Sequence, residues 1–323
     1  MKKCISLLLA VTLVITLFAG CSANKENGAG TSKIKVVTTI YPMYDWIMNI
    51  AGDDKHTDIT VLLNNGVDIH NYQPTADDII KISTCDLFIY VGGESDKWVD
   101  DTLSSAQNKK MKIINLMDVL GESVKEEEVV EGMQGEEEET KEEETEYDEH
   151  VWLSLKNASK FVDEITKVLC ELDSKDTELY TNNASAYKEK LSALDKEYQQ
   201  TVASSKNKTL LFGDRFPFRY MVDDYGLTYY AAFVGCAAES EASFETISFL
   251  ANKVNELSLG YVMTIDGSDQ KIAKTIIANT KTKNQKVLTL DSMQSITQEK
   301  IDSGENYLSI MQSNLNVLKE ALS

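Results

Sequence analysis

The fold of this chain is decided by residues 173–205, which read DSKDTELYTNNASAYKEKLSALDKEYQQTVASS. Apolar and aromatic residues recur there at spacings of three and four, as the side chains on one face of a helix do. They are Tyr180, Ala184, Tyr187, Leu191, Leu194 and Tyr198. A helix of this length spans roughly 50 Å at about 1.5 Å per residue, which is too long for one small domain. We therefore predict a linker helix over 173–205 that joins two domains.

The sequence on either side of this helix alternates between short β-branched runs and helical segments. The expected strands are 34–40, 58–63, 86–91 and 112–116 before the helix, and 209–212, 227–233, 261–265 and 287–290 after it. Another helix is expected at 155–172. Strands that alternate with helices favour parallel sheets. The predicted class is α/β, with an N-terminal lobe over 34–172 and a C-terminal lobe over 206–323.

The first residues, MKKCISLLLAVTLVITLFAGC, have the pattern of a secretory signal. Two lysines precede an apolar run, and small residues then precede Cys21. We expect a signal peptide over 1–20, a lipid on Cys21 and a flexible tether over 21–33. An uncleaved membrane anchor is the alternative, although the apolar run is short for a span of about 20 residues. The chain is expected outside the cytoplasm, held on the cell membrane by its lipid.

Composition narrows the range of partners. The chain has 323 residues and a formal net charge of −20, which disfavours nucleic acid and anionic lipid surfaces. Such a charge suits a protein that attracts cations, and it also suits solubility alone. Beyond Cys4 and Cys21 the remaining cysteines are Cys85, Cys170 and Cys236, an odd number without a CxxC pair. We expect them to be single buried thiols.

Residues 122–149 form a strongly acidic segment, with EEEVVEGMQGEEEETKEEETEYDE from Glu126 onwards. Few of its residues could pack in a core, so the segment is predicted to be a disordered loop. Its carboxylates could gather divalent cations weakly, or the segment could be a solvated insert without a role in binding.

The three histidines differ in context. His70 follows a predicted strand and precedes a helix, and Asp291 follows the strand 287–290, which are positions where open parallel sheets bind ligands. His150 begins the ordered sequence after the acidic segment. A helix-capping role for His70 and a surface position for His150 are the alternatives. His56 lies in a polar connection, and we expect it to be exposed and inert.

Four segments, in this order, resemble one known family. They are GVDIHNYQPTADDIIKISTCDLFIYVGG (66–93), EHVWLSLKNASKFVDEI (149–165), DDYGLTYYAAFVGCAAESEASFETI (223–247) and NYLSIMQSNLNVLKEAL (306–322). Behind a lipoprotein signal, they are similar to the zinc and manganese substrate-binding lipoproteins of ABC import systems, and most similar to the zinc-type members.

The resemblance implies two α/β lobes joined by a rigid helix, with a metal ion in the cleft. His70, His150 and Asp291 fall on family ligand positions. Imidazole nitrogen and carboxylate oxygen suit Zn²⁺, and Mn²⁺ also accepts carboxylates. The resemblance further implies a monomer that carries the metal ion as its transported ligand and has an ABC permease as its partner.

One family ligand position departs from the pattern. The family has His or Glu ten residues before the Tyr of its YGL motif, and this chain has Arg215 there. Arginine stays protonated and cannot bind a cation. Asp214, Cys236, Glu239 or water could complete the ligand shell.

Arg215 itself needs a neutralising partner if a divalent ion binds nearby, because like charges repel. We expect that partner to be Glu239 or Glu241, which lie in the loop after the next strand.

The predicted function is that of a binding protein, which captures zinc or a similar ion and delivers it to a permease. A surface adhesin or scaffold with a structural metal is the first alternative, and a metalloenzyme is the second. The sequence has no HExxH and no GxSxG motif, so we expect no catalytic residues.

Overall fold

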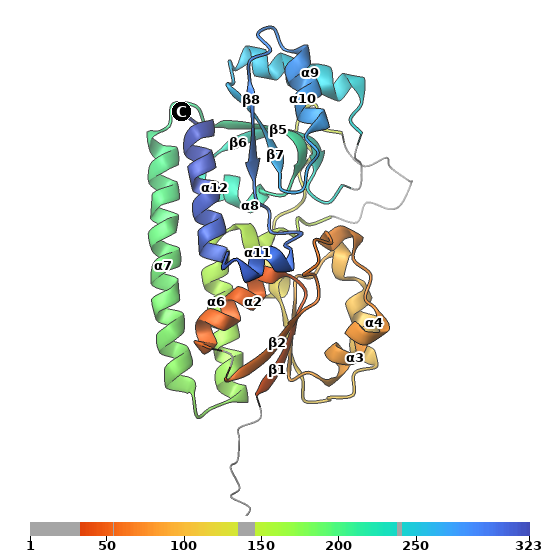
Figure 1. Cartoon of the computed structure of the whole chain (residues 1–323), viewed down its shortest axis with the longest axis vertical. Coiled ribbons are helices and arrows are strands. Elements are labelled where there is room, and N and C mark those ends of the chain that lie inside the picture. The colour runs from red at the N-terminus through yellow and green to blue at the C-terminus, as the bar shows by residue number, and fades with distance from the viewer. Residues whose placement is uncertain (1–32, 54, 135–145, 238–240) are drawn as a thin grey trace, which may run out of the picture. The chain divides into compact units, whose positions relative to one another are not determined.

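Runs of β-branched and aliphatic residues form two parallel sheets in the computed structural model, which describes residues 33–53, 55–134, 146–237 and 241–323. The first sheet has the order β2-β1-β3-β4 and the second has the order β6-β5-β7-β8. The strands are β1 (Ile34–Thr38), β2 (Thr57–Val61), β3 (Leu87–Tyr90), β4 (Lys112–Asn115), β5 (Thr209–Phe216), β6 (Thr228–Val234), β7 (Tyr261–Ile265) and β8 (Lys286–Leu290). The predicted α/β class with two parallel-sheet lobes is confirmed (Figure 1).

In each sheet the strand order reverses between the two central strands. β1 lies beside β3 in the first lobe, and β5 lies beside β7 in the second. The chain therefore leaves these neighbouring strands toward opposite edges of the sheet. In open parallel sheets a crevice forms at such a point, at the carboxyl ends of the strands, and ligands bind there.

Helices cover the sheets and connect the strands. They are α2 (Tyr41–Ala51), α3 (Ala76–Thr84), α4 (Trp98–Ser104), α5 (Leu116–Leu120), α6 (Leu155–Leu172), α7 (Thr177–Ser204), α8 (Arg219–Tyr225), α9 (Phe244–Glu256), α10 (Lys271–Asn279), α11 (Gln298–Asp302) and α12 (Tyr307–Ala321). The start of α3 is fixed by a reciprocal capping box, in which Thr75 and Asp78 each bond the other's backbone N–H. Pro42 lies in the first turn of α2, where a missing N–H costs nothing.

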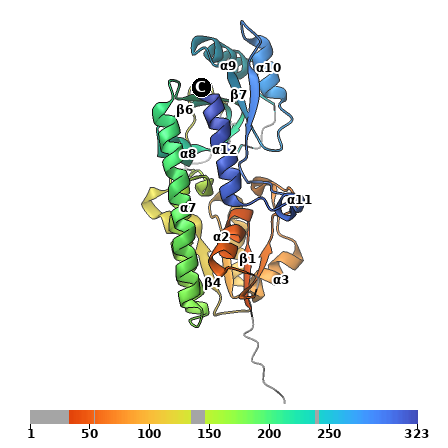
Figure 2. The same ribbon diagram turned by 60° about the vertical axis from the view of Figure 1, so that its left-hand side comes forward.

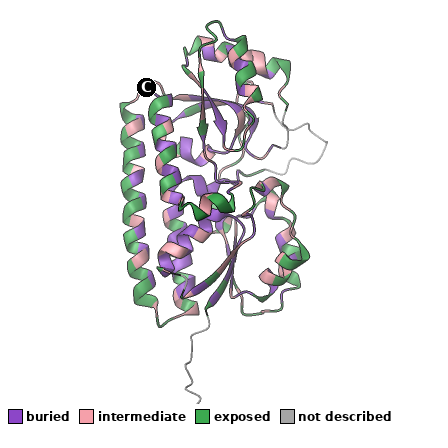
Figure 3. Ribbon diagram, viewed as in Figure 1, coloured by how far each residue is buried: buried purple, intermediate pink, exposed green. Residues whose placement is uncertain are grey.

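The long helix α7 begins four residues later than the sequence indicated. Asp173 ends α6, and Asp176 precedes the first residue of α7, so 173–176 form the turn between two antiparallel helices. The buried face of α7 consists of Tyr180, Ala184, Tyr187, Leu191, Leu194, Tyr198 and Val202. Figure 3 shows this face buried and the opposite face exposed along the helix.

Helix α7 contacts elements of both lobes, as Figures 1 and 2 show. In its first half, the Tyr187 hydroxyl donates to Asp45 Oδ2 of α2 at 3.1 Å. In its second half, the Tyr198 hydroxyl donates to the Met311 carbonyl of α12 at 2.6 Å. Because one continuous helix holds both sets of contacts, it sets the spacing between the lobes.

A shared aromatic core also joins the lobes. Trp46 of α2 packs edge-on against Tyr307 of α12, with ring centroids 5.3 Å apart. The Tyr307 hydroxyl donates to the Trp152 carbonyl at 2.7 Å, and Trp152 Nε1 donates to the Ser292 carbonyl at 2.9 Å. All three rings are fully buried. These bonds tie the segment that carries His150 to the loop after β8.

The acidic segment is ordered at both ends, and the prediction of disorder is wrong for 122–134 and 146–149. Gln134 pairs with Phe233 beside β6, and its backbone N–H donates to the Ala232 carbonyl at 2.9 Å. Met133 is buried, and the Glu127 N–H bonds the Glu146 carbonyl. The edge strand β6 and a few apolar side chains suffice to order these residues. A prediction from composition alone does not take such contacts into account. Residues 135–145 lie outside the described residues.

The predicted signal peptide, the lipid-bearing Cys21 and nearly all of the tether also lie outside the described residues. Among the helices that the structure describes, none combines the length and apolar character that a membrane crossing requires.

Gly213 provides a test of how the second lobe is packed. A Cβ atom on Gly213 would lie 2.5 Å from the Ala273 Cα atom and 2.7 Å from its backbone nitrogen, because α10 crosses β5 there. We expect Gly213→Ala to lower the free energy of unfolding by about 2–3 kcal/mol, as overpacking does. Urea unfolding of the two proteins measures the difference.

Gly260→Ala is the matched control, because the added methyl would meet no atom within 4 Å. Equal stability of the two variants would show that β5 and α10 are not packed this closely.

Candidate metal centre

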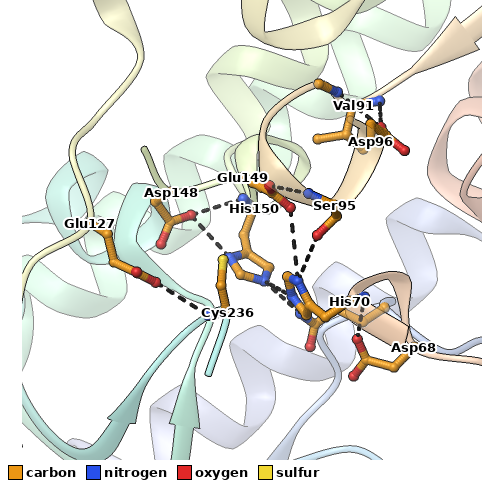
Figure 4. A network of polar contacts seen from close by, with 12 residues as sticks. Asp68, His70, Val91, Ser95, Asp96, Glu127, Asp148, Glu149, His150 and Cys236 are labelled. Atoms are coloured by element: carbon orange, nitrogen blue, oxygen red, sulfur yellow. Dashed lines mark hydrogen bonds and ion pairs between the residues drawn. The ribbon is translucent and has the colours of Figure 1, made fainter. Parts of the chain in front are cut away.

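Two loops of the first lobe place two histidines face to face (Figure 4). His70 lies in the short 3₁₀ turn Ile69–Asn71 after β2, and His150 immediately precedes the turn Val151–Leu153. Their Nε2 atoms are 3.2 Å apart. His150 is fully buried, and the His70 side chain is 8% exposed. The structure thus brings together two of the predicted site residues.

The other ring nitrogen of each histidine is held by an oxygen. Nδ1 of His70 lies 2.8 Å from Ser95 Oγ, and Nδ1 of His150 lies 3.1 Å from Asp148 Oδ1. An oxygen acceptor at Nδ1 places the proton there and leaves Nε2 with its lone pair. Both Nε2 lone pairs therefore point into the same small space.

Such a pair is suited to a cation. A tetrahedral ion with metal–nitrogen distances of about 2.0–2.1 Å holds two nitrogens about 3.3 Å apart. The observed separation of 3.2 Å matches this geometry. Oxygen partners at Nδ1 are also the usual means by which proteins orient ligating imidazoles.

Gln294, in the loop after β8, completes this arrangement. Its amide nitrogen lies 3.0 Å from His70 Nε2 and 2.5 Å from His150 Nε2. Gln294 is 2% exposed, and its Oε1 accepts from Ser292 Oγ at 3.1 Å. The amide N–H groups thus donate to both imidazoles, which offsets the repulsion between their lone pairs.

Cys236 brings a sulfur atom to the same place. It lies in the turn after β6, and its Sγ and one ring nitrogen of each histidine all lie within 4.8 Å of one another. The backbone N–H of Cys236 donates to Glu127 Oε1 at 3.2 Å. Among the described residues, His70, His150 and Cys236 are the group at this cleft that could hold a metal ion.

Two glycines permit the close approach of these loops. A Cβ on Gly235 would lie 2.8 Å from His150 Cε1, and one on Gly93 would lie 2.5 Å from Glu149 Oε1. Gly93 also has a φ of +79°, which favours glycine. Both chain segments can therefore reach the histidine pair only without a side chain at these positions.

The surroundings of the pair are largely buried and acidic. Burial, followed by the nearby charges of His150 and Arg215, lowers the pKa of His70 to about 3. Burial raises the pKa of Glu127 to about 7, and it also raises the pKa of Glu149. One buried oxygen of Glu149, Oε2, has no hydrogen-bond partner and lies 3.8 Å from His70 Nδ1. At neutral pH the His70 imidazole is therefore uncharged, as metal ligation requires.

Arg215 is neutralised by Asp68, a partner that the sequence analysis did not name. Arg215 Nη2 lies 2.5 Å from Asp68 Oδ2, and their side chains are 17% and 16% exposed. Asp68 Oδ1 also accepts the His70 backbone N–H at 3.1 Å. We expected Arg215 to pair with Glu239 or Glu241, and the structure pairs it with Asp68 across the two lobes instead. Glu239 lies outside the described residues.

Asp291 is not brought to the histidine pair. Its Oδ2 lies 2.7 Å from Lys300 Nζ, and its Oδ1 accepts the Met293 N–H. Asp214 lines the cleft, but its two carboxylate oxygens accept the backbone N–H groups of Arg215 and Ile265. As a ligand, either residue would have to give up these partners.

His56, expected to be exposed and inert, is partly buried. Its Nδ1 lies 3.0 Å from Asp176 Oδ2 at the start of α7, with a side-chain exposure of 24%. This is a local polar contact, and the His56 ring packs edge-on against Tyr180.

A cavity of about 310 Å³ opens beside the site. His70 and Asn71 line it from the first lobe, and Arg215, Cys236 and Ser268 are among the residues that line it from the second. It gives His70 and Cys236 a route to solvent, whereas His150 lies fully buried behind them.

Sequence reasoning missed Gln294 and the groups that hold the two Nδ1 atoms. Asp148 carried a signal, because it precedes His150 by two residues and could be expected to bond it locally. Gln294 lies three residues beyond Asp291 in the same loop. Ser95 carried no such signal, because only the folded chain brings it to His70.

Known proteins are similar to this chain in sequence and in architecture. The zinc-binding lipoprotein AdcA of Streptococcus pneumoniae is 34% identical over 321 residues, which cover 99% of this chain and 61% of AdcA. The chain thus spans about three fifths of that relative's length. The high-affinity zinc uptake system protein ZnuA of Bacillus subtilis is 29% identical over 325 residues, which cover 98% of this chain and 97% of the relative.

The Zn(II)-bound crystal structure of the ZnuA-like domain of S. pneumoniae AdcA superposes with a TM-score of 0.70 at 30% identity, over 90% of this chain and 99% of that domain. The family described as zinc-uptake complex component A, periplasmic, matches residues 36–321. With this match over most of its length, the chain belongs to the ZnuA family.

Proposed function

We propose that this protein captures a divalent transition metal ion at His70 and His150, zinc before manganese, and delivers it to an ABC permease. The observation that carries the proposal is the pair of Nε2 atoms 3.2 Å apart, with each ring held by an oxygen at Nδ1. Family membership and the names of the relatives support zinc as the ion and uptake as the process. A binding role needs no catalytic residue.

Zinc is favoured over manganese by the type of ligand. Imidazole nitrogen suits zinc, whereas manganese prefers carboxylate and other oxygen ligands. Asp148 is engaged on His150 Nδ1, and Asp291 is paired with Lys300. Asp291 remains a proposed ligand only if zinc binding opens its ion pair with Lys300.

The proposal includes attachment to the cell membrane through Cys21. It is supported by the apolar run that ends in Ala19, Gly20 and Cys21, and by the relative named as a lipoprotein. A single bound chain would then release its ion from the cleft to the permease.

Zinc should stabilise the folded protein, because a ligand that binds only this state adds RT ln(1 + [L]/Kd), about 4 kcal/mol at a thousandfold excess over Kd. His70→Ala and His150→Ala should each abolish most of the zinc-induced rise in Tm. His56→Ala is the control and should keep the full rise, because His56 bonds Asp176 instead. Thermal unfolding with and without zinc, together with calorimetry, measures both effects.

An undiminished rise in both site variants would place the zinc site elsewhere. A scaffold with a structural metal makes a different prediction, since removal of zinc by a chelator would then unfold the protein. For a transport protein, zinc loss should be reversible with the fold retained.

Arg215→Met should destabilise the protein by about 1–3 kcal/mol, because it leaves the largely buried Asp68 carboxylate without its partner. The second change in Arg215→Met/Asp68→Asn should recover part of this loss, since the amide carries no charge and can still accept the His70 N–H. Urea unfolding of the two single variants and the double variant gives the coupling energy.

Lys188→Met is the control, because Lys188 pairs with an Asp163 side chain that is 60% exposed, and such pairs contribute little. A loss at Arg215 no larger than that at Lys188 would mean that the interlobe pair does not hold the lobes together.

Cys21→Ser should prevent lipid attachment, since the hydroxyl cannot replace the thiol in this modification. We expect labelled palmitate to be absent from the variant and the protein to appear in the medium rather than with the membranes. Incorporation of label equal to the wild type would refute the anchor.

A further inference from the structure

We propose that the thiolate of Cys236 is the third metal ligand, which makes this a two-imidazole, one-thiolate site that selects zinc strongly against manganese. The inference rests on the proposed function, since it assumes that a metal ion binds at His70 and His150. It adds the ligand that the position of Arg215 leaves open.

The geometry places the sulfur within reach of the same ion. Cys236 Sγ and a ring nitrogen from each histidine lie within 4.8 Å of one another. Zinc with about 2.3 Å to sulfur and about 2.0–2.1 Å to nitrogen would bring these atoms to about 3.6 Å apart. A movement of roughly 1 Å in the turn after β6 therefore suffices. Figure 4 shows the sulfur directed toward the His150 ring.

Neighbouring groups hold Cys236 in this place. Glu127 Oε1 accepts its backbone N–H at 3.2 Å, and Gly235 allows the turn to lie against His150. Burial, followed by the nearby carboxylates of Glu127, Glu149 and Asp148, raises the pKa of the Cys236 thiol, so its proton must leave when the metal ion binds. The turn is thus anchored from the acidic segment on one side and from the histidine pair on the other.

The other candidates among the described residues are engaged. Arg215 is a cation bound to Asp68, Asp291 is bound to Lys300, and Asp214 accepts two backbone N–H groups. Gln294 is the remaining neighbour of both Nε2 atoms. A half-turn of its amide would present Oε1 as a neutral fourth ligand.

This ligand set determines ion preference. Thiolate is a soft ligand that binds zinc well, and manganese prefers oxygen ligands. A site with two imidazoles, one thiolate and one amide oxygen contains no carboxylate. We therefore expect zinc and cadmium to bind tightly and manganese to bind weakly.

Cobalt reports the ligand directly. The full-length protein loaded with Co²⁺ in place of zinc should show thiolate-to-cobalt charge-transfer absorption in the near ultraviolet. Cys236→Ser should remove this absorption and weaken zinc binding by about 100-fold or more, which exceeds the usual effect of outer partners. Cys170→Ser is the matched control, because Cys170 lies at the end of α6 and contacts Thr177, and it should change neither readout.

A second measurement uses the unaltered chain and so does not depend on the folding of a variant. Zinc should protect Cys236 from alkylation by iodoacetamide, as mass spectrometry of the peptide would show, and His70→Ala should remove the protection. Zinc binding without protection, without charge transfer and with full affinity in Cys236→Ser would overturn the thiolate inference and leave the proposed function intact. No zinc binding to the wild type would overturn both.

Discussion

Two acceptor nitrogens of His70 and His150 that face each other at 3.2 Å repel unless a donor or cation lies between them. The rest of the structure serves to keep them there. Asp148 and Ser95 fix both rings through Nδ1, so neither can turn away. The amide of Gln294 supplies N–H groups that a metal ion can replace. The site is therefore preorganised for a cation by the arrangement of its hydrogen bonds.

The helix α7 and the shared aromatic core allow this arrangement to persist. Gln294 belongs to the second lobe, so the distance between lobes must be controlled within a fraction of an ångström. The Trp152 bond to Ser292 ties the His150 segment to the loop of Gln294, and Tyr187 and Tyr198 bind α7 to helices of both lobes. The Asp68–Arg215 pair adds a charged contact across the cleft, beside His70.

The sequence predicted the elements well and the side-chain partners poorly. Hydrophobic period and residue type identified the eight strands of the described residues and the long helix, because these features depend on local sequence. The resemblance predicted His70 and His150 as ligands, and the structure places their rings together. The partner of Arg215 was not, because Asp68 lies 147 residues away and meets it only after the lobes assemble. Asp291 was predicted as a ligand because it directly follows a strand. That position does not reveal that Lys300 forms an ion pair with its carboxylate.

The acidic segment shows how composition can conceal a structural role. Its middle lies outside the described residues, yet its ends supply Glu127, Asp148 and Glu149, which surround the histidine pair and Cys236. Carboxylates in a buried site are costly unless a cation compensates them, and burial does raise the pKa of Glu127 and Glu149. A divalent ion between the imidazoles would lower that cost. Without a metal ion, these negative surroundings disfavour the thiolate form of Cys236. They would favour a bound metal ion, because the positive ion interacts with all of these groups at once.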